Sequence, residues 1–238
     1  MKSRCDIVYF VKESESNDEL KYSLRTVEKN WPYRYVWFCG GCPKDLEPDK
    51  KFRFKQKGLN KWENVRNSIR LACENEEISE NFWLFNDDFF ILKPYDKNMK
   101  PQYNGQISSY IDAIVRKHNN SHSQYTLRLM ATIKGLEDAG CTTYNYEVHK
   151  PMLINRKKAL EVLDKFPNVP GFRSIYGNYW KIGGTDRHDM KIKQMIYGRM
   201  DLVENEWDFL STSDSSFASG EVGVFIKQNF KERSRFEI

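Results

Sequence analysis

The chain has 238 residues, of which 39% are hydrophobic and 14% aromatic, enough to bury the core of one large domain or two small ones. Its mean hydropathy of −0.73 is typical of a soluble protein, and no apolar run approaches the roughly 20 residues that span a bilayer. A membrane-spanning class is therefore excluded. The first residues lack the apolar segment of a signal peptide, so we expect a cytoplasmic protein.

The formal net charge of +5 suits anionic substrates such as nucleotide diphosphates, and it permits a polyanion such as DNA as a partner. An odd number of cysteines, five, argues against a disulfide framework. Cys39 and Cys42 form an isolated C-x-x-C pair without the second ligand pair that a zinc site needs. The two glycines between them favour a turn after a strand over redox chemistry.

Through the first hundred residues, strand-like segments alternate with segments of helical periodicity. Residues 6–11 read as a buried strand, and residues 17–30 as an amphipathic helix capped by Asn17 or Asp18. Trp31-Pro32 ends that helix, and a second strand follows at 35–38. This β-α-β order favours parallel strands with a right-handed crossover, and the continued alternation predicts an α/β domain. The next expected elements are a strand at 52–55, a helix at 62–73 and two strand-length apolar runs within 82–92.

The second half reads as more helical. A polar connector at 99–104 precedes two expected helices, at 107–118 and 125–139, which form a helical insertion at about 106–140. The remaining expectations are a strand at 144–149, a helix at 157–166 capped by Asn155, a substrate-facing loop at 169–184 and a helix near 222–230. No internal repeat or long linker interrupts the chain, so a single domain covering residues 1–238 is the simplest organisation.

The most informative motif is Asn86-Asp87-Asp88, which lies between two apolar runs of strand length. Such flanks place the acidic pair where a buried strand leaves the core. Two carboxylates there can hold a hard divalent cation, Mg or Mn, and still leave coordination positions for substrate phosphates. The alternative is that Asn86 and Asp87 only turn the chain.

Several other residues could serve the same site. His149 ends an expected strand and could act as a catalytic base or bind a donor phosphate. Arg173 could pair with a diphosphate through its planar guanidinium, or form a surface salt bridge. Weaker candidates are Lys61 and Asn64, which open a helix where phosphate could bind; Tyr176 and Asn178, which could contact a sugar or base; His188, within an Asp186–Asp189 cluster; and Asp214.

Several blocks together resemble the Stealth family of sugar-phosphate transferases. Residues 18–29 look like the start of that family's second conserved region, and residues 84–90 resemble its Asn-Asp-Asp motif. His149-Lys150-Pro151, Asn155-Arg156, Phe166-Pro167 and Phe172-Arg173-Ser174 are similar to its third region. Residues 6–12 keep the first strand but lack the family's Trp-Val-Asp-Gly ending.

The resemblance implies a GT-A-like core, a mixed α/β sheet flanked by helices, with a nucleotide-sugar donor and a metal held by Asp87 and Asp88. Asp88, His149 and Arg173 would be catalytic, and Lys61, Asn64, Asn86, Tyr176 and Asn178 would bind substrate. We expect a metal-dependent glycosyltransferase acting on an acceptor hydroxyl of DNA, a glycan or a protein. Sugar-1-phosphate transfer, as in the Stealth family, and a non-catalytic nucleotide-sugar or nucleic-acid binder are the alternatives. The short chain and the incomplete first block favour glycosyl transfer.

Overall fold

A computed structural model describes residues 5–238 except 56–57, 59, 97–98, 119–120 and 194–206. In the described part of the chain, no helix combines the length and the apolar character needed to cross a membrane.

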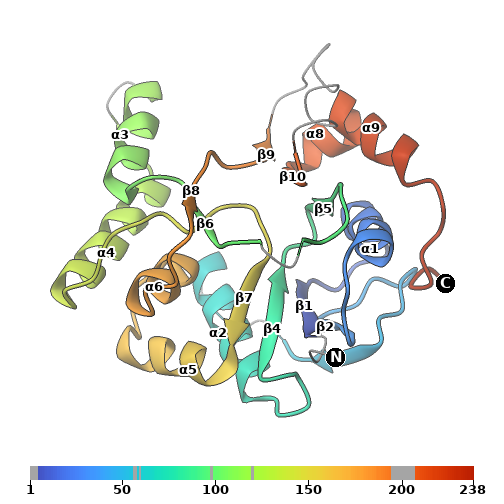
Figure 1. Cartoon of the computed structure of the whole chain (residues 1–238), viewed down its shortest axis with the longest axis horizontal. Coiled ribbons are helices and arrows are strands. Elements are labelled where there is room, and N and C mark those ends of the chain that lie inside the picture. Colours follow the sequence, from blue (N-terminus) through green and yellow to red (C-terminus); the bar gives the residue numbers. More distant parts are fainter. Residues whose placement is uncertain (1–4, 56–57, 59, 97–98, 119–120, 194–206) are drawn as a thin grey trace.

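A five-stranded sheet forms the centre of the molecule, with four parallel strands and one antiparallel strand at its edge (Figure 1). The spatial order is β3-β2-β1-β4-β7. The bounds are β1 Asp6–Val11, β2 Val36–Gly40, β3 Lys50–Arg53, β4 Asn81–Phe85 and β7 Met152–Asn155. Because β7 runs against its neighbour β4, the residues just before β7 lie near the residues just after β4.

Helices cover both faces of this sheet, as the apolar faces of its strands require (Figure 1). On one face lie α2 (Lys61–Glu74), α5 (Arg156–Lys165) and α6 (Phe172–Tyr179), which pack on Val8, Phe82 and Leu84. On the other face α1 (Asp18–Asn30) buries Leu20, Leu24 and Val27 against the sheet.

A smaller sheet of β5 (Phe89–Ile91), β10 (Phe209–Thr212) and β9 (Lys191–Ile192) continues from the end of β4. Its own core lies beneath α8 (Asp214–Ser219) and α9 (Glu221–Asn229). A helical pair, α3 (Ile107–Lys117) and α4 (Gln124–Asp138), has a separate small core, and a two-residue pair joins β6 (Gln102–Tyr103) to β8 (Thr185–Asp186).

The predicted α/β class, with a mainly parallel sheet flanked by helices, is confirmed. The caps expected at Asn17 and Asn155 are present, since each side chain accepts a backbone N–H of the first turn. Two expectations are wrong. Residues 144–149 form no strand. The chain there contacts α6 and makes one isolated β-bridge, and β7 begins only at Met152. The expected loop at 169–184 contains helix α6, whose apolar side packs into the core.

The Cys39–Cys42 segment is a glycine turn, as its composition indicated. Gly40 has a φ of +107°, and a Cβ on Gly41 would lie 2.2 Å from the backbone nitrogen of Glu13. Both cysteines are free and buried, and burial raises the pKa of each thiol. A raised thiol pKa opposes the thiolate that redox chemistry needs.

Candidate active site at the end of strand β4

The Asn86–Asp88 turn connects β4 of the central sheet to β5 of the smaller sheet. The backbone N–H of Phe89 donates to the carbonyl oxygen of Asn86 at 3.3 Å, which closes the turn. Phe85 and Phe89, on either side, are each only 1% exposed and belong to the same core. Buried rings fix both ends of the turn, so its polar residues lie at the carboxyl ends of the parallel strands.

Asp88 is buried, and its two carboxylate oxygens have different surroundings. Oδ2 accepts hydrogen bonds from Lys191 Nζ at 2.7 Å and from Ser211 Oγ at 3.0 Å. Oδ1 is buried and has no hydrogen-bond partner among the described residues. An unpaired buried acceptor is costly, and native structures contain few of them, so this oxygen is a natural place for a ligand.

Asp87 contacts the start of α1. Its Oδ2 accepts a hydrogen bond from Asn17 Nδ2 at 3.0 Å, while Asn17 Oδ1 caps the helix. Burial raises the pKa of Asp87; the bond from Asn17 opposes this, and the nearby charge of Asp88 adds to it. Asn17 therefore performs two tasks, and no sequence pattern pointed to the second.

A third carboxylate, Glu19, belongs to the same neighbourhood. Its Oε1 accepts the hydroxyl of Thr212 at 2.6 Å. Burial and the negative charges of Asp88, Asp214 and Asp87 raise the pKa of Glu19 to about 7, although the Thr212 bond opposes the shift. The electrostatic field here favours an added cation, which would relieve repulsion among these carboxylates.

His149 lies beside the turn, with its ring edge-on to Phe89 at a centroid distance of 6.4 Å. Asp189 binds it twice: Oδ2 lies 2.7 Å from the imidazole Nδ1, and Oδ1 accepts the His149 backbone N–H at 2.8 Å. Burial would raise the pKa of Asp189, but the bonds and charge of His149 hold it below its ordinary value. A carboxylate on Nδ1 fixes the ring's orientation and leaves Nε2 to face a substrate.

Arg173 belongs to α6, which covers the face of the central sheet opposite α1, and its side chain reaches the turn. It is only 8% exposed, and its Nη1 donates to the Lys150 carbonyl at 2.7 Å. Its Nη2 donates to Asn86 Oδ1 at 3.4 Å, and its guanidinium lies 5.6 Å from the centre of the Phe89 ring. Burial lowers its pKa, which the charges of Glu147, Asp88 and Asp189 oppose. The structure thus brings Asn86, Asp88, His149 and Arg173 together around Phe89.

The other predicted residues lie elsewhere or have structural partners. Lys61 and Asn64 open α2, where Asn64 Oδ1 accepts the Gly58 N–H at 2.7 Å. Asn178 is 1% exposed, and its amide makes four bonds within the fold, to Thr142, Tyr144 and Ser174. We therefore leave Asn178 out of the proposed site. Tyr176 lines a separate pocket described below, and His188 is exposed while its neighbour Asp189 contacts His149.

Sequence reasoning missed Lys191, Ser211, Glu19 and Glu147. Glu147 accepts the Ser174 backbone N–H at 2.9 Å and lies in the field of Arg173. Lys191 and Ser211 come from short strands of the smaller sheet, whose pairing with β5 no local pattern indicated. Within the described ranges, no group of three or more His, Cys, Asp or Glu side chains is arranged to hold a metal ion.

No protein-family model and no curated protein matches the chain. Solved structures similar to it include the apo form of the glycosyltransferase GlyE of Streptococcus pneumoniae, at 9% identity and a TM-score of 0.41, with 88% of this chain and 54% of GlyE covered. An active-site mutant of LgtC is 11% identical, with a TM-score of 0.45; the match covers 97% of this chain and 98% of LgtC. Apo mouse xyloside xylosyltransferase 1 is 10% identical, with a TM-score of 0.34 and 85% and 91% covered.

The chain therefore spans about half the length of GlyE and nearly all of LgtC. Membership of the Stealth family stays a prediction. The fold and the site define a mixed α/β protein with an acidic turn, a histidine–aspartate pair and a buried arginine at one edge of its parallel sheet.

Proposed function

We propose that the protein is a metal-dependent glycosyltransferase that moves a sugar from a nucleotide-diphosphate sugar to an acceptor hydroxyl. The observation that carries the proposal is the buried, unpartnered Oδ1 of Asp88, in a turn that also presents Asp87 and adjoins His149. Ligands of open α/β sheets bind outside the carboxyl ends of the strands, where this turn lies.

Asp87 and Asp88 would hold the cation. Their hard carboxylate oxygens suit Mg or Mn, and two protein ligands leave room for donor phosphates. A free buried oxygen on Asp88 and the raised pKa values of Asp87 and Glu19 fit an added positive charge. When bound, the ion would neutralise charge on the diphosphate leaving group.

His149 would act as the general base, with Asp189 holding its ring through Nδ1. In the transfer, the acceptor oxygen forms a bond to the anomeric carbon while that carbon's bond to the diphosphate oxygen breaks. The acceptor hydroxyl proton passes to Nε2 of His149, and the nucleoside diphosphate leaves as the anion. Arg173 would stabilise that anion or hold Asn86 in position, given the contact between the two side chains.

DNA as the acceptor stays a prediction. It rests on the net charge of +5 and on two basic segments, 50–55 and 187–193. In these segments Lys51 pairs with Glu47, Lys50 lies 3.8 Å from Glu77, and Lys191 pairs with Asp88. These ion pairs reduce the positive charge available to phosphates. Polyanion binding would show as affinity that falls steeply with salt.

The test is a thermal-shift panel of nucleotide sugars with and without Mn, followed by analysis of donor breakdown. A ligand at about 100 times its Kd should stabilise the protein by roughly 2.7 kcal/mol. Asp88→Asn should abolish the metal-dependent shift. Asp164→Asn, which removes an exposed pair with Arg70 of the same 2.7 Å length, is the matched control.

The proposal is wrong if no nucleotide sugar stabilises the wild type with Mn, or if Asp88→Asn responds as the wild type does. The products separate the two chemistries. A released nucleoside diphosphate indicates glycosyl transfer, whereas a nucleoside monophosphate indicates sugar-1-phosphate transfer.

A further inference from the structure

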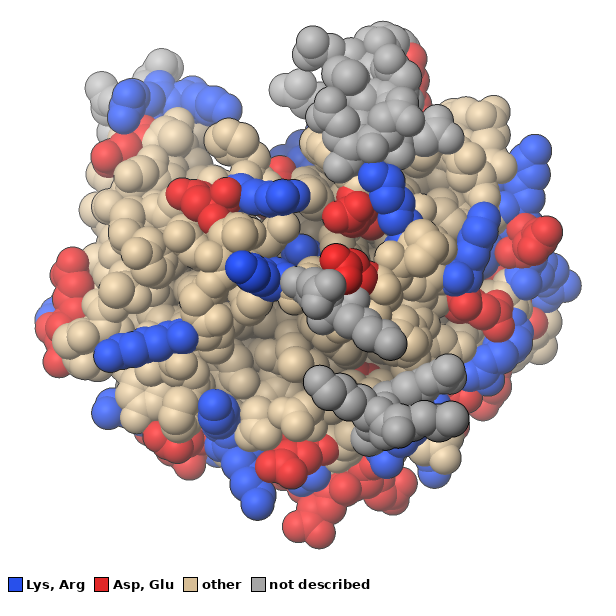
Figure 2. Space-filling view, viewed as in Figure 1, with Lys and Arg blue, Asp and Glu red and all other residues tan. Residues whose placement is uncertain are grey.

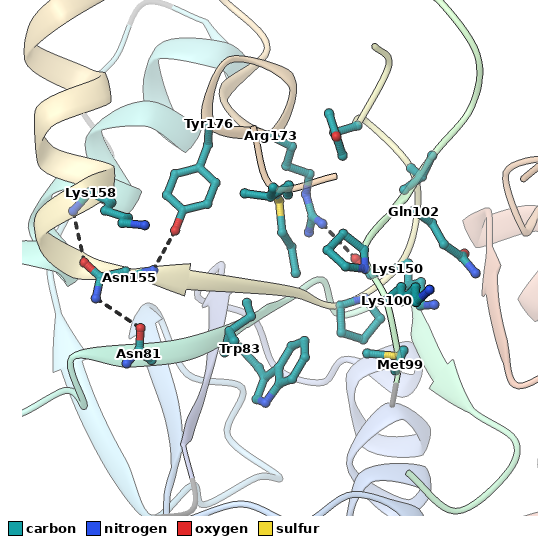
Figure 3. A pocket seen from close by; sticks show the side chains of 17 residues that line it. Asn81, Trp83, Met99, Lys100, Gln102, Lys150, Asn155, Lys158, Arg173 and Tyr176 are labelled. Atoms are coloured by element: carbon teal, nitrogen blue, oxygen red, sulfur yellow. Dashed lines mark hydrogen bonds between the residues drawn. The ribbon is translucent and has the colours of Figure 1, made fainter. Parts of the chain in front are cut away.

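A pocket apart from the Asn86–Asp88 turn lies at the free edge of the central sheet, beyond strand β7 (Figure 3). Its volume is about 320 Å³, within the range of small-molecule sites, and it is bounded by β7, by α6 and by residues 99–102. None of the chemistry assigned to Asp87, Asp88 and His149 uses it. On the face shown in Figure 2, basic side chains stand beside a hollow of uncharged surface near the middle of the molecule.

The walls of this pocket are largely apolar. Trp83, Met99, Tyr146 and Met152 contribute aromatic rings and flexible thioethers. Figure 3 shows Trp83 and Tyr176 on opposite sides of strand β7. Surfaces of this kind bind planar or chain-like apolar groups, and methionine side chains adapt to irregular shapes.

The charges around the pocket are all of one sign. Lys100, Lys150, Lys158 and Arg173 line it, and none of the other described residues in its lining is Asp or Glu. None of these four cations forms an ion pair in the part of the chain that the structure describes. Lys158 Nζ instead lies 4.7 Å from the centre of the Trp180 ring. Lys150 is 6% exposed, and its Nζ lies 4.7 Å from the centre of the Phe209 ring. Four cations along an apolar pocket are complementary to an anion with an apolar body, although one of them, Arg173, also lies in the field of Glu147.

One hydroxyl donor also has no partner. The Tyr176 hydroxyl oxygen accepts the backbone N–H of Asn155 at 2.9 Å, and no acceptor for its own proton is found among the described residues. A buried hydroxyl can donate as well as accept, so this proton is available to an anionic oxygen in the pocket.

Arg173 connects this pocket to the turn at the end of β4. It lines the pocket, donates to the Lys150 carbonyl and reaches Asn86. The pocket and the turn therefore share one cationic side chain.

We infer that the pocket binds an amphiphilic anion, an apolar ring or chain carrying a phosphate or carboxylate, and that this molecule is the acceptor of the transfer. The second half of this inference rests on the proposed function. The first half concerns binding alone and needs neither donor nor metal.

The test is calorimetric titration of the wild type, without metal or donor, with 1-naphthyl phosphate, decyl phosphate, inorganic phosphate and uncharged 1-naphthol. We expect both organic phosphates to bind at least tenfold more tightly than inorganic phosphate or 1-naphthol. Equal affinity for inorganic phosphate would remove the role of the apolar walls, and equal affinity for 1-naphthol would remove the role of the cations. A preference for one organic phosphate would identify a ring or a chain as the body.

Two lysines of α5 provide a matched pair of variants. Lys158 lines the pocket and lies 4.7 Å from the Trp180 ring centre, whereas Lys165 lies 4.8 Å from that of Tyr179 and does not line it. Lys158→Gln should weaken 1-naphthyl phosphate about tenfold, the usual size of a charge-assisted contact, and Lys165→Gln should leave its affinity unchanged. Tyr176→Phe should weaken it several-fold. If Lys158→Gln and Lys165→Gln behave alike, the assigned pocket is wrong.

Asp88→Asn separates this inference from the proposed function. One outcome is that the wild type shows no donor breakdown, while 1-naphthyl phosphate binds equally well to the wild type and to Asp88→Asn. The pocket then still binds an amphiphilic anion, and only the assignment of that anion as the acceptor is lost. If 1-naphthyl phosphate does not bind while donor breakdown requires Asp88, the inferred ligand of the pocket is wrong and the proposed transferase function is unaffected.

Discussion

Lys191 and Asp88 form an ion pair that uses only one of the two carboxylate oxygens. Lys191 Nζ lies 2.7 Å from Oδ2, which also accepts the Ser211 hydroxyl, while Oδ1 is buried and finds no partner in the described ranges of the chain. The ammonium group thus partly neutralises the carboxylate in the absence of any other cation. A divalent ion could bind Oδ1 beside the lysine or replace the lysine on Oδ2, and the two arrangements predict different behaviour.

The first prediction concerns Lys191→Gln. If the ion competes with the ammonium group, this variant should bind Mn about tenfold more tightly than wild type, because one opposing charge is removed. Without metal it should be less stable by about 1–3 kcal/mol, since a largely buried carboxylate loses its partner. Metal titration and urea unfolding measure the two effects. Lys134→Gln, which removes an exposed pair with Asp138, should change neither. Weaker Mn binding in Lys191→Gln would contradict competition.

The second prediction concerns the His149–Asp189 pair. His149→Gln should lower kcat by about 10²–10⁴-fold, the usual contribution of general acid–base catalysis, with donor binding nearly unchanged. Asp189→Asn should lower kcat by a smaller factor, because it disturbs the ring's orientation and leaves the base in place. The double variant should be no slower than His149→Gln alone, since residues acting as one unit are not additive. Independent, multiplying losses would show that Asp189 acts elsewhere.

The third prediction follows from Glu19, whose pKa is raised to about 7 by burial and by neighbouring carboxylates. A carboxyl group with a folded-state pKa above its unfolded value favours the folded state below the unfolded pKa and loses that contribution as pH rises through the folded one. Wild type should therefore lose stability relative to Glu19→Gln between about pH 4.5 and pH 7. Glutamine can still accept the Thr212 hydroxyl, so the comparison isolates the charge.

Unfolding midpoints of both proteins measured across that range test this relationship. Parallel curves for wild type and variant would rule out the raised pKa. Addition of Mn should reduce the pH dependence of the wild type alone, because a bound cation favours the ionised carboxylate.

The fourth prediction concerns the glycine turn after β2. Gly41→Ala should destabilise the protein by about 2–3 kcal/mol, because its Cβ would overlap the backbone of Lys12 and Glu13, which cannot move aside as a side chain can. Gly140→Ala is the control: its φ is +67° but the space around it is open, so about 1 kcal/mol of backbone strain is the whole cost. If Gly41→Ala and Gly140→Ala lose the same free energy of unfolding in urea, the backbone around Gly41 can move to make room for a Cβ.

The sequence predicted the elements whose signals are local. The periodicity of residues 17–30, the caps at Asn17 and Asn155 and the apolar runs around Asn86 each depend on neighbours within a few positions. It failed at 144–149 and at α6, where long-range packing decides the conformation. Polar partners such as Lys191 and Ser211 reach Asp88 through strand pairs more than 100 residues away in sequence, and no pattern within either segment encodes that distance.

The reversed direction of β7 has a consequence for how the chain tolerates length changes. Met152 pairs with Leu84 and Asn155 with Asn81, so the three residues from His149 to Pro151 join the start of β7 to the contact between His149 and Asp189. Deleting one residue there would either pull His149 away from Asp189 or shift β7 by one position and turn Ile154 out of the core. A deletion between Asn75 and Glu80, at the other end of β4, would instead disturb the buried Ile78 and the hydrogen bonds between Ser79 and Asp6, and would leave the contact between His149 and Asp189 in place.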